Sequence, residues 1–268
     1  MREKLYLASR RRTTLVEDIA YSLLGIFNVS IPVVYGEGDR AVGRFLERIL
    51  AGSSDVTILA WTGHAGGYNS CLPPDLAVYD YLVPPHVPQP IEMVEMDNIV
   101  ATLRSSLPYL SLAVVIHDHL HKLPSPSFLA SRLGLPGIIF PVTQLEIMRL
   151  VSETDLRIYR ATTSVLGEVE IKTRDNLSQL DDLLLMHPWI SPLLDQEFSH
   201  RATVFDRTTR GLRLIARLRQ PFGALLLAPV SRTWYRRVAA DCLIMARVHE
   251  EASLSELVDG ICTTVDIQ

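Results

Sequence analysis

The sequence predicts an α+β protein in which N-terminal helices precede a strand-rich C-terminal region. Two N-terminal segments repeat apolar residues at helical spacing, whereas many apolar runs after residue 136 are short and bounded by glycine, proline or polar turn residues. Apolar residues make up 48% of the 268 residues and charged residues 21%, as in ordinary globular proteins. The chain is therefore expected to fold around a sizeable core.

The first predicted helix covers residues 15–27 and begins at a capping box. Thr14 and Glu17 have the spacing at which a helix N-cap and its third residue exchange hydrogen bonds. Gly25 and Asn28 predict the end of this helix. Its apolar side consists of Ile19, Ala20, Leu23, Leu24 and Phe27.

The next segment is expected to be extended over residues 31–34 and then to turn at Gly36 and Gly38. A second amphipathic helix follows, with Ala41, Val42, Phe45, Leu46, Ile49 and Leu50 on its apolar side. Glycines before a helix can hold a phosphate, but Glu37 and Asp39 would repel that anion. A tight turn with Asp39 as the helix N-cap is the preferred interpretation.

Residues 55–61 are predicted to form a strand, and residues 63–90 an irregular connection rich in glycine and proline. This connection is the best place for a domain boundary. The chain is expected to divide into residues 1–62, a connection at 63–92, and an α+β region at 93–268.

The C-terminal region is predicted to contain one clear helix and several strands. The helix has an apolar stripe of Leu112, Ala113, Ile116, Leu120 and Leu123. The predicted strands lie at 137–142, 158–163, 167–172, 183–186, 212–218, 222–228 and 238–248.

Charge and cysteine content exclude several classes of protein. A formal net charge of -4 argues against a dedicated nucleic-acid binder. Cys71, Cys242 and Cys262 form no Cys-x-x-Cys pair, so reduced thiols are expected rather than disulfides or a zinc site. No apolar run approaches the roughly 18 residues of a membrane span, and no secretory signal is apparent. These features favour a cytoplasmic protein.

The densest polar cluster lies on the helix of the C-terminal region. His117 and His121 have the i, i+4 spacing that presents two imidazoles to a metal ion. Asp118 would replace the usual glutamate base, and no motif for a third ligand is apparent. The preferred interpretation is that these residues occupy the solvated flank of the helix, and no cofactor is expected.

Arginines are concentrated near the end of the chain, at Arg207, Arg210, Arg213, Arg217, Arg219, Arg232, Arg236 and Arg237. They could hold an anionic partner, but aromatic residues are not interleaved as stacking on single-stranded nucleic acid requires. A solvated face of a sheet is the preferred interpretation.

The segment from Ser9 to Trp61 carries two conspicuous runs. The first is EDIAYSLLGIF, from Glu17 to Phe27, and the second is Tyr35-Gly36-Glu37-Gly38. Together these runs resemble the closing portion of the fungal heterokaryon-incompatibility (HET) domain. The resemblance implies a role in nonself recognition and in the programmed cell death that follows fusion of incompatible hyphae.

The resemblance also implies a truncated member of the family. The N-terminal half of the HET domain, which is similar to the TIR fold, is missing, and Met1 falls inside the domain. The leading hypothesis is a non-enzymatic interaction or regulatory protein whose partner is another copy of itself or another HET-type chain. The alternative is an enzyme, either a TIR-like NAD-cleaving assembly completed by another chain or a metal-dependent hydrolase using His117 and His121.

The residues that match the family are expected to be structural rather than catalytic. They are Glu17, Asp18, Tyr21, Gly25, Tyr35, Gly36, Glu37 and Gly38. Acidic residues at positions 17 and 18 would suit the first turn of a helix, where negative charge complements the helix dipole.

Overall fold

The computed structural model describes residues 1–80, 110–151, 154–178, 181–189, 207–248 and 262–268. Helices and strands account for 30% of the chain each, so the protein is of mixed helix and strand class, as the sequence predicts. No helix among the described residues is both long enough and apolar enough to cross a membrane.

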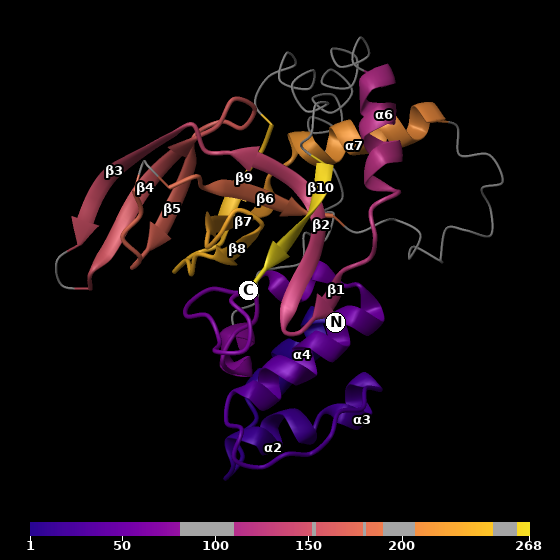
Figure 1. Ribbon diagram of the computed structural model, residues 1–268, viewed down its shortest axis with the longest axis vertical. Helices are drawn as coiled ribbons and strands as arrows, with labels where there is room; N and C mark the ends of the chain where they lie inside the picture. The colour runs from indigo at the N-terminus through magenta and orange to yellow at the C-terminus, as the bar shows by residue number, and fades with distance from the viewer. Residues whose placement is uncertain (81–109, 152–153, 179–180, 190–206, 249–261) are drawn as a thin grey trace, which may run out of the picture.

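The N-terminal region is helical. Its elements are α1 (Arg2–Ser9), α2 (Val16–Tyr21), α3 (Leu24–Phe27), α4 (Arg40–Ser53) and two 3-10 helices, η1 (Val56–Leu59) and η2 (Leu76–Asp80). Figure 1 shows these helices below the strands, with α4 nearer to the strands than α2 and α3. The long helix α4 agrees with the predicted amphipathic helix, because all six predicted apolar residues are buried.

The predicted helix at 15–27 is two short helices, and its capping box is absent. Leu15 rather than Thr14 occupies the N-cap of α2, and its apolar side chain cannot accept a hydrogen bond. The Glu17 carboxylate binds backbone amides of a later loop. Gly25 lies inside α3, and Asn28 ends α3 in the left-handed conformation, with φ of 52°. Asp39 does occupy the N-cap of α4, but its side chain makes no capping hydrogen bond.

The predicted strand at 55–61 is wrong, because this segment contains η1. The Asp55 carboxylate accepts hydrogen bonds from the backbone and side chain of Thr57, which stabilises a tight turn rather than an extended chain. Ile58 and Leu59 of this turn are both buried.

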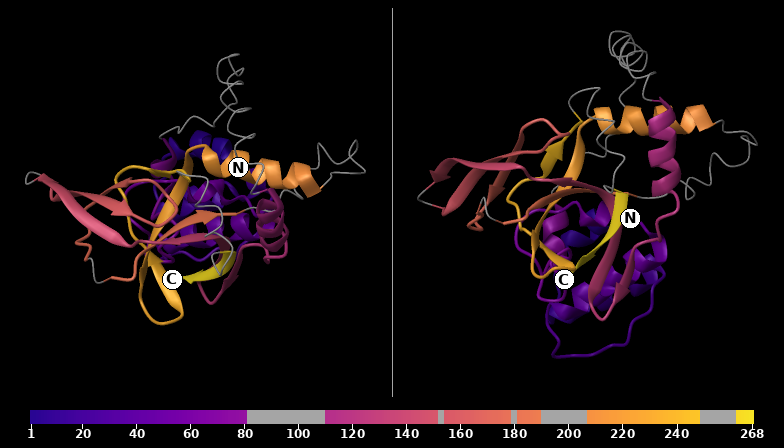
Figure 2. Two further views of the ribbon diagram at one scale, coloured as in Figure 1. Left: turned by 90° about the horizontal axis from the view of Figure 1, so that it is seen from above. Right: turned by 45° about the horizontal axis from the view of Figure 1, so that its top comes forward.

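The strands form two sheets. The larger contains β1 (Ser127–Leu129), β2 (Arg132–Pro141), β6 (Leu184–Pro188), β7 (Phe222–Pro229), β8 (Trp234–Arg237), β9 (Ile244–Ala246) and β10 (Cys262–Ile267). The smaller contains β3 (Gln144–Val151), β4 (Leu156–Thr162) and β5 (Val169–Thr173). In both views of Figure 2 the smaller sheet projects from one side of the molecule.

The pairings of the larger sheet close into a circuit of strands. Strand β2 pairs with β10 over residues 133–138 and with β6 over residues 137–141. Strands β10, β8, β7 and β6 pair in that order. All these pairings are antiparallel except the short parallel contact between β10 and β8. The circuit is barrel-like, and β9 adds to β7 outside it.

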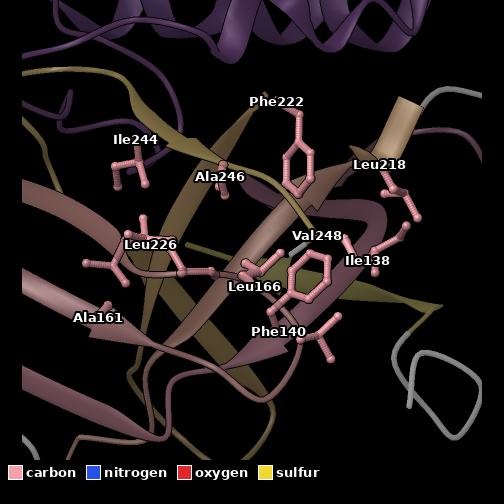
Figure 3. Packing of buried hydrophobic residues seen from close by; sticks show 14 of the residues in the cluster. Ile138, Phe140, Ala161, Leu166, Leu218, Phe222, Leu226, Ile244, Ala246 and Val248 are labelled. Carbon is pink, nitrogen blue, oxygen red and sulfur yellow. The ribbon is translucent and has the colours of Figure 1, made fainter. Parts of the chain in front are cut away.

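Side chains of the circuit alternate between two hydrophobic clusters. Leu184 and Met186 belong to the cluster of the N-terminal helices, whereas Leu185 belongs to the cluster of two further helices, α6 (Leu110–Leu120) and α7 (Arg207–Arg219). Figure 3 shows the second of these clusters, which includes Phe140 and Phe222. The rings of these two residues stack, with centroids 6.1 Å apart. Strands buried on both faces explain the continuous apolar run in β7.

Two helices cover the opposite side from the N-terminal region (Figure 1). They are α6 (Leu110–Leu120), which agrees with the predicted helix, and α7 (Arg207–Arg219). They approach closely at Gly211, where a Cβ would lie 2.9 Å from side-chain atoms of Leu110 and Val114.

The predicted strand at 212–218 is wrong, because these residues belong to α7. The alternation of arginine and leucine fits a strand, but Leu214, Ile215 and Leu218 also follow helical spacing, and all three are buried. The arginines therefore do not form the predicted sheet face.

Five predicted strands overlap observed ones, namely 137–142, 158–163, 167–172, 183–186 and 222–228 with β2, β4, β5, β6 and β7. Only β9 lies within the predicted strand at 238–248, and β1, β3, β8 and β10 were not predicted.

The divisions at residues 62 and 92 stay a prediction. Residues from both sides of them share one cluster, which joins Phe45 and Trp61 to Leu135 and Ile267.

Two glycines of α4 provide a test of this packing. A Cβ at Gly43 would overlap the Cβ and ring of Tyr68, whereas a Cβ at Gly52 would meet no atom within 4 Å. We expect Gly43→Ala to lower the free energy of unfolding by about 1–3 kcal/mol through overpacking. Gly52→Ala should leave it unchanged or raise it by up to about 1 kcal/mol, because alanine favours helix. Urea denaturation measures both, and equal effects would contradict the packing of α4 on Tyr68.

Candidate functional site

Glu17 connects α2 to the loop that precedes α4. Its carboxylate accepts hydrogen bonds from the backbone N–H groups of Gly36 and Gly38, at 2.8 and 3.0 Å. Both glycines have positive φ, 88° and 60°, a conformation that other residues rarely adopt. Hydrogen bonds from backbone amides, including its own, hold the pKa of Glu17 below its ordinary value although the residue is buried.

Tyr21 anchors the same loop further upstream. Its hydroxyl accepts a hydrogen bond from the backbone N–H of Val34 at 2.8 Å. The hydroxyl proton can be donated either to the Val34 carbonyl, at 2.7 Å, or to Glu37, at 2.9 Å. When the proton is donated to the carbonyl, one phenol satisfies both backbone groups of Val34 without any strand pairing.

Glu37 and Arg44 join the loop to α4. The guanidinium of Arg44 donates to both carboxylate oxygens of Glu37, at 2.6 and 2.8 Å, and to the carbonyl of Pro32 at 2.7 Å. This ion pair is largely shielded from solvent, with side chains 20% and 13% exposed. The hydrogen bond with Glu37 raises the pKa of Arg44.

Asp18 and Tyr35 form a further link on the outer side. The Tyr35 hydroxyl donates to the Asp18 carboxylate at 3.0 Å, which raises the pKa of Tyr35. Its ring meets the ring of Tyr21 edge-on, with centroids 5.8 Å apart. This contact orients Tyr35 along the surface of α2.

The structure therefore brings seven of the eight family-matched residues together around residues 28–39. We call Glu17, Tyr21, Glu37 and Arg44 the loop clamp. Gly25 stands apart in α3, where a Cβ would meet nothing within 4 Å. The sequence did not predict a role for Arg44, because its seven-residue separation from Glu37 across a turn carries no recognisable signal.

The clamped loop exposes apolar side chains. Val33, Val34 and Tyr35 are 56%, 46% and 60% exposed, although the clamp binds the backbone of Val34. Leu15 and Val16, at the start of α2, are also about half exposed, at 48% and 51%. A group of exposed apolar residues on an ordered backbone is a feature of protein-binding surfaces.

The sequence predicts that the histidines at residues 117–121 lie on the solvated flank of their helix. This prediction is wrong for His117. His117 is buried and stacks on His121, with ring centroids 6.1 Å apart. Burial lowers the pKa of His117, and the nearby His121 and Arg210 add to this effect. Within the described ranges, no three His, Cys, Asp or Glu residues are grouped so that they could hold a metal ion.

The arginines near the end of the chain have separate roles. Arg237 is buried in β8, where its guanidinium donates to the carbonyls of Leu59 and Trp61, each at 2.8 Å. Burial lowers the pKa of Arg237 to about 10. Arg236 forms an exposed ion pair with Asp175, at 3.1 Å.

Comparison with known proteins gives one short match. No family model matches the chain, and no solved structure matches it. A stretch of 41 residues is 54% identical to the vegetative incompatibility protein HET-E-1 of Podospora anserina. The match covers 15% of this chain and 3% of that protein. Similarity to a vegetative incompatibility protein is thus established for a small part of the chain.

The charge of Glu17 provides a test of the loop clamp. Because the pKa of folded Glu17 lies below its ordinary value of 4.5, the ionised carboxylate stabilises the folded state above that pH. This contribution is lost as the pH falls through the lowered pKa. We expect Glu17→Gln to have a lower Tm than the wild type at neutral pH, and the difference to shrink below pH 4.5.

Thermal denaturation between neutral and acidic pH measures this difference. Glu3→Gln is the matched control, because Glu3 is an exposed carboxylate on α1. It should follow the wild type at every pH. A Tm deficit of Glu17→Gln that does not change with pH would show that the charge of Glu17 does not hold the loop.

Proposed function

We propose that this chain is a non-enzymatic interaction or regulatory protein of the fungal heterokaryon-incompatibility type, acting in the cytoplasm. In this proposal, α1 to α4 are the closing part of a HET domain of TIR-like origin. The loop at residues 28–39 docks on another HET-type chain. The similarity to a vegetative incompatibility protein supports the incompatibility type, and the exposed apolar residues of the clamped loop support the docking role.

The clamp suits the loop for binding because it orders the backbone in advance. Binding normally loses free energy when a mobile segment becomes ordered. Here the backbone groups of Val34 and the amides of Gly36 and Gly38 already have partners in the free protein. The apolar side chains of Val33 and Tyr35 can therefore be buried by a partner with little further ordering.

A substitution at Val33 tests this docking role. Val33→Lys places a charge in the exposed segment, where the side chain of Val33 is 56% exposed. The change should alter the free energy of unfolding by less than about 0.5 kcal/mol, as is usual at exposed positions. Ile147→Lys is the matched control, since Ile147 is a similarly exposed apolar residue of β3.

The variants are expressed in hyphae of Podospora anserina that contain HET-E-1, and dead cells are counted with a vital dye. The wild type and Ile147→Lys are expected to change the fraction of dead cells relative to an empty vector, whereas Val33→Lys should match the vector. An effect of Val33→Lys equal to that of the wild type would reject the loop as the docking surface. A wild type equal to the vector would reject the incompatibility role.

The enzymatic alternative has its own test. We expect purified protein, with or without added zinc, to release no nicotinamide from NAD and to hydrolyse no ester substrate above a protein-free control. His121→Ala should then be indistinguishable from the wild type in both assays. Turnover that His121→Ala abolishes would instead favour a metal-dependent hydrolase, and release of nicotinamide would favour a NAD-cleaving enzyme.

A further inference from the structure

The smaller sheet has one covered edge and one open edge. The chain between β8 and β9 covers β5, because the N–H of Asp241 donates to the carbonyl of Lys172 and the hydroxyl of Thr173 donates to the carbonyl of Ala239. At the other edge, β4 is the one strand among the described residues that pairs with β3. Figure 1 shows β3 at the outer margin of the sheet. An edge strand offers backbone N–H and C=O groups to a further strand.

The side chains along β3 are exposed. Five consecutive residues, from Glu146 to Leu150, are all exposed. Three of them are large and apolar, namely Ile147, Met148 and Leu150, and each is about half exposed or more. Apolar residues gathered at one exposed place are typical of a surface that contacts another protein.

A bulge brings Glu146 and Arg149 to the same face of the sheet. In a regular strand, residues three positions apart point to opposite faces. The register of β3 against β4 shifts after Ile147, so that Glu146 lies opposite Arg160 and Arg149 lies opposite Ile158. Since residues 158 and 160 are two positions apart in β4, they share a face. Their partners in β3 therefore share that face as well.

The opposite face of β3 continues the hydrophobic core. Ile147 lies opposite Tyr159, which is buried in the core cluster. Leu150 lies opposite Arg157, two positions from Tyr159, and so belongs to the same face as Ile147. The open edge thus has one charged face and one apolar face, and the apolar face extends past the core into solvent.

The charged face is complementary to a second copy of itself. When two β3 strands run antiparallel about a two-fold axis, residue i meets residue j and residue j meets residue i. Glu146 of each copy can then lie opposite Arg149 of the other, on the same face. The same register brings Ile147 of each copy opposite Met148 of the other. Glu146 accepts one hydrogen bond, from the side chain of Gln144 at 2.6 Å, to only one of its two carboxylate oxygens.

The bulge itself favours a second copy over an unrelated strand. A bulge increases the local twist of an edge, which hinders pairing with a flat strand. A second copy carries the same bulge at the same place, so under two-fold symmetry the two edges twist alike.

We propose that two copies of this chain pair through their β3 strands, which join the two three-stranded sheets into one continuous sheet. Ion pairs between Glu146 and Arg149 form on one face, and Ile147, Met148 and Leu150 are buried on the other. Because a single pair of short strands buries less than the roughly 1,200–2,000 Å² of a stable interface, the dimer is weak and depends on concentration. Docking of the loop at residues 28–39 does not require this pairing.

Sedimentation velocity of the purified protein tests the proposal. The wild type is expected to shift from monomer toward dimer between micromolar and millimolar concentration. Glu146→Arg and Arg149→Glu each place like charges opposite one another, so each should weaken self-association by about tenfold or more. An equimolar mixture of these two variants should regain the dimer, because every charge then meets its opposite. Recovery on mixing also shows that both variants are folded.

Glu3→Arg and Arg11→Glu are the matched controls, because they make the same changes of charge at exposed positions of the N-terminal region. Both should associate as the wild type does. A wild type that stays monomeric at millimolar concentration, a mixture that does not recover, or controls as weak as the β3 variants would each overturn the proposal. Sedimentation does not depend on cell death in hyphae, so this proposal and the proposed function fail independently.

Discussion

Arg237 carries a positive charge into the interior of the protein, and two carbonyl groups of the N-terminal region surround it. A buried cation is stable only while such partners remain in place, so the segment at residues 59–61 cannot move away from β8 without a large loss of free energy. The ring of Trp61, 3.9 Å from the guanidinium carbon, adds a cation–π contact. Asn69 strengthens the same junction, because its amide donates to the carbonyls of Ser131 and Ile267.

Helix α4 connects this junction to the exposed loop at residues 28–39. Its apolar side, including Phe45 and Ile49, packs in the cluster that also contains the strands of the larger sheet. Its polar side carries Arg44, which holds Glu37 and Pro32 of the loop. The loop therefore has a rigid support although it contains no regular secondary structure. Backbone groups of Pro32, Val34, Gly36 and Gly38 have partners in the helices, while the apolar side chains of Val33 and Tyr35 are exposed.

Local periodicity predicted the elements whose pattern has one interpretation. Helix α4 is an example, because a helix brings Val42, Phe45 and Ile49 to one side, whereas a strand would turn Val42 to the opposite face. The segment at 212–218 was assigned wrongly, since its apolar residues fit both periods and packing against α6 selects the helix. The partnership of Glu37 with Arg44 and the burial of Arg237 against Leu59 and Trp61 depend on tertiary contacts, which a single sequence does not encode in any short spacing.

The closed circuit of strands affects the order in which the protein can assemble. Strand β10 lies between β2 and β8, yet it follows all other described strands along the chain. During synthesis, the helices and β2 therefore emerge long before the strand that completes their sheet. Contacts between such distant segments form slowly, and unpaired strand edges attract other chains in the meantime. A nascent chain of this topology is a natural client of molecular chaperones until residues 262–267 are in place.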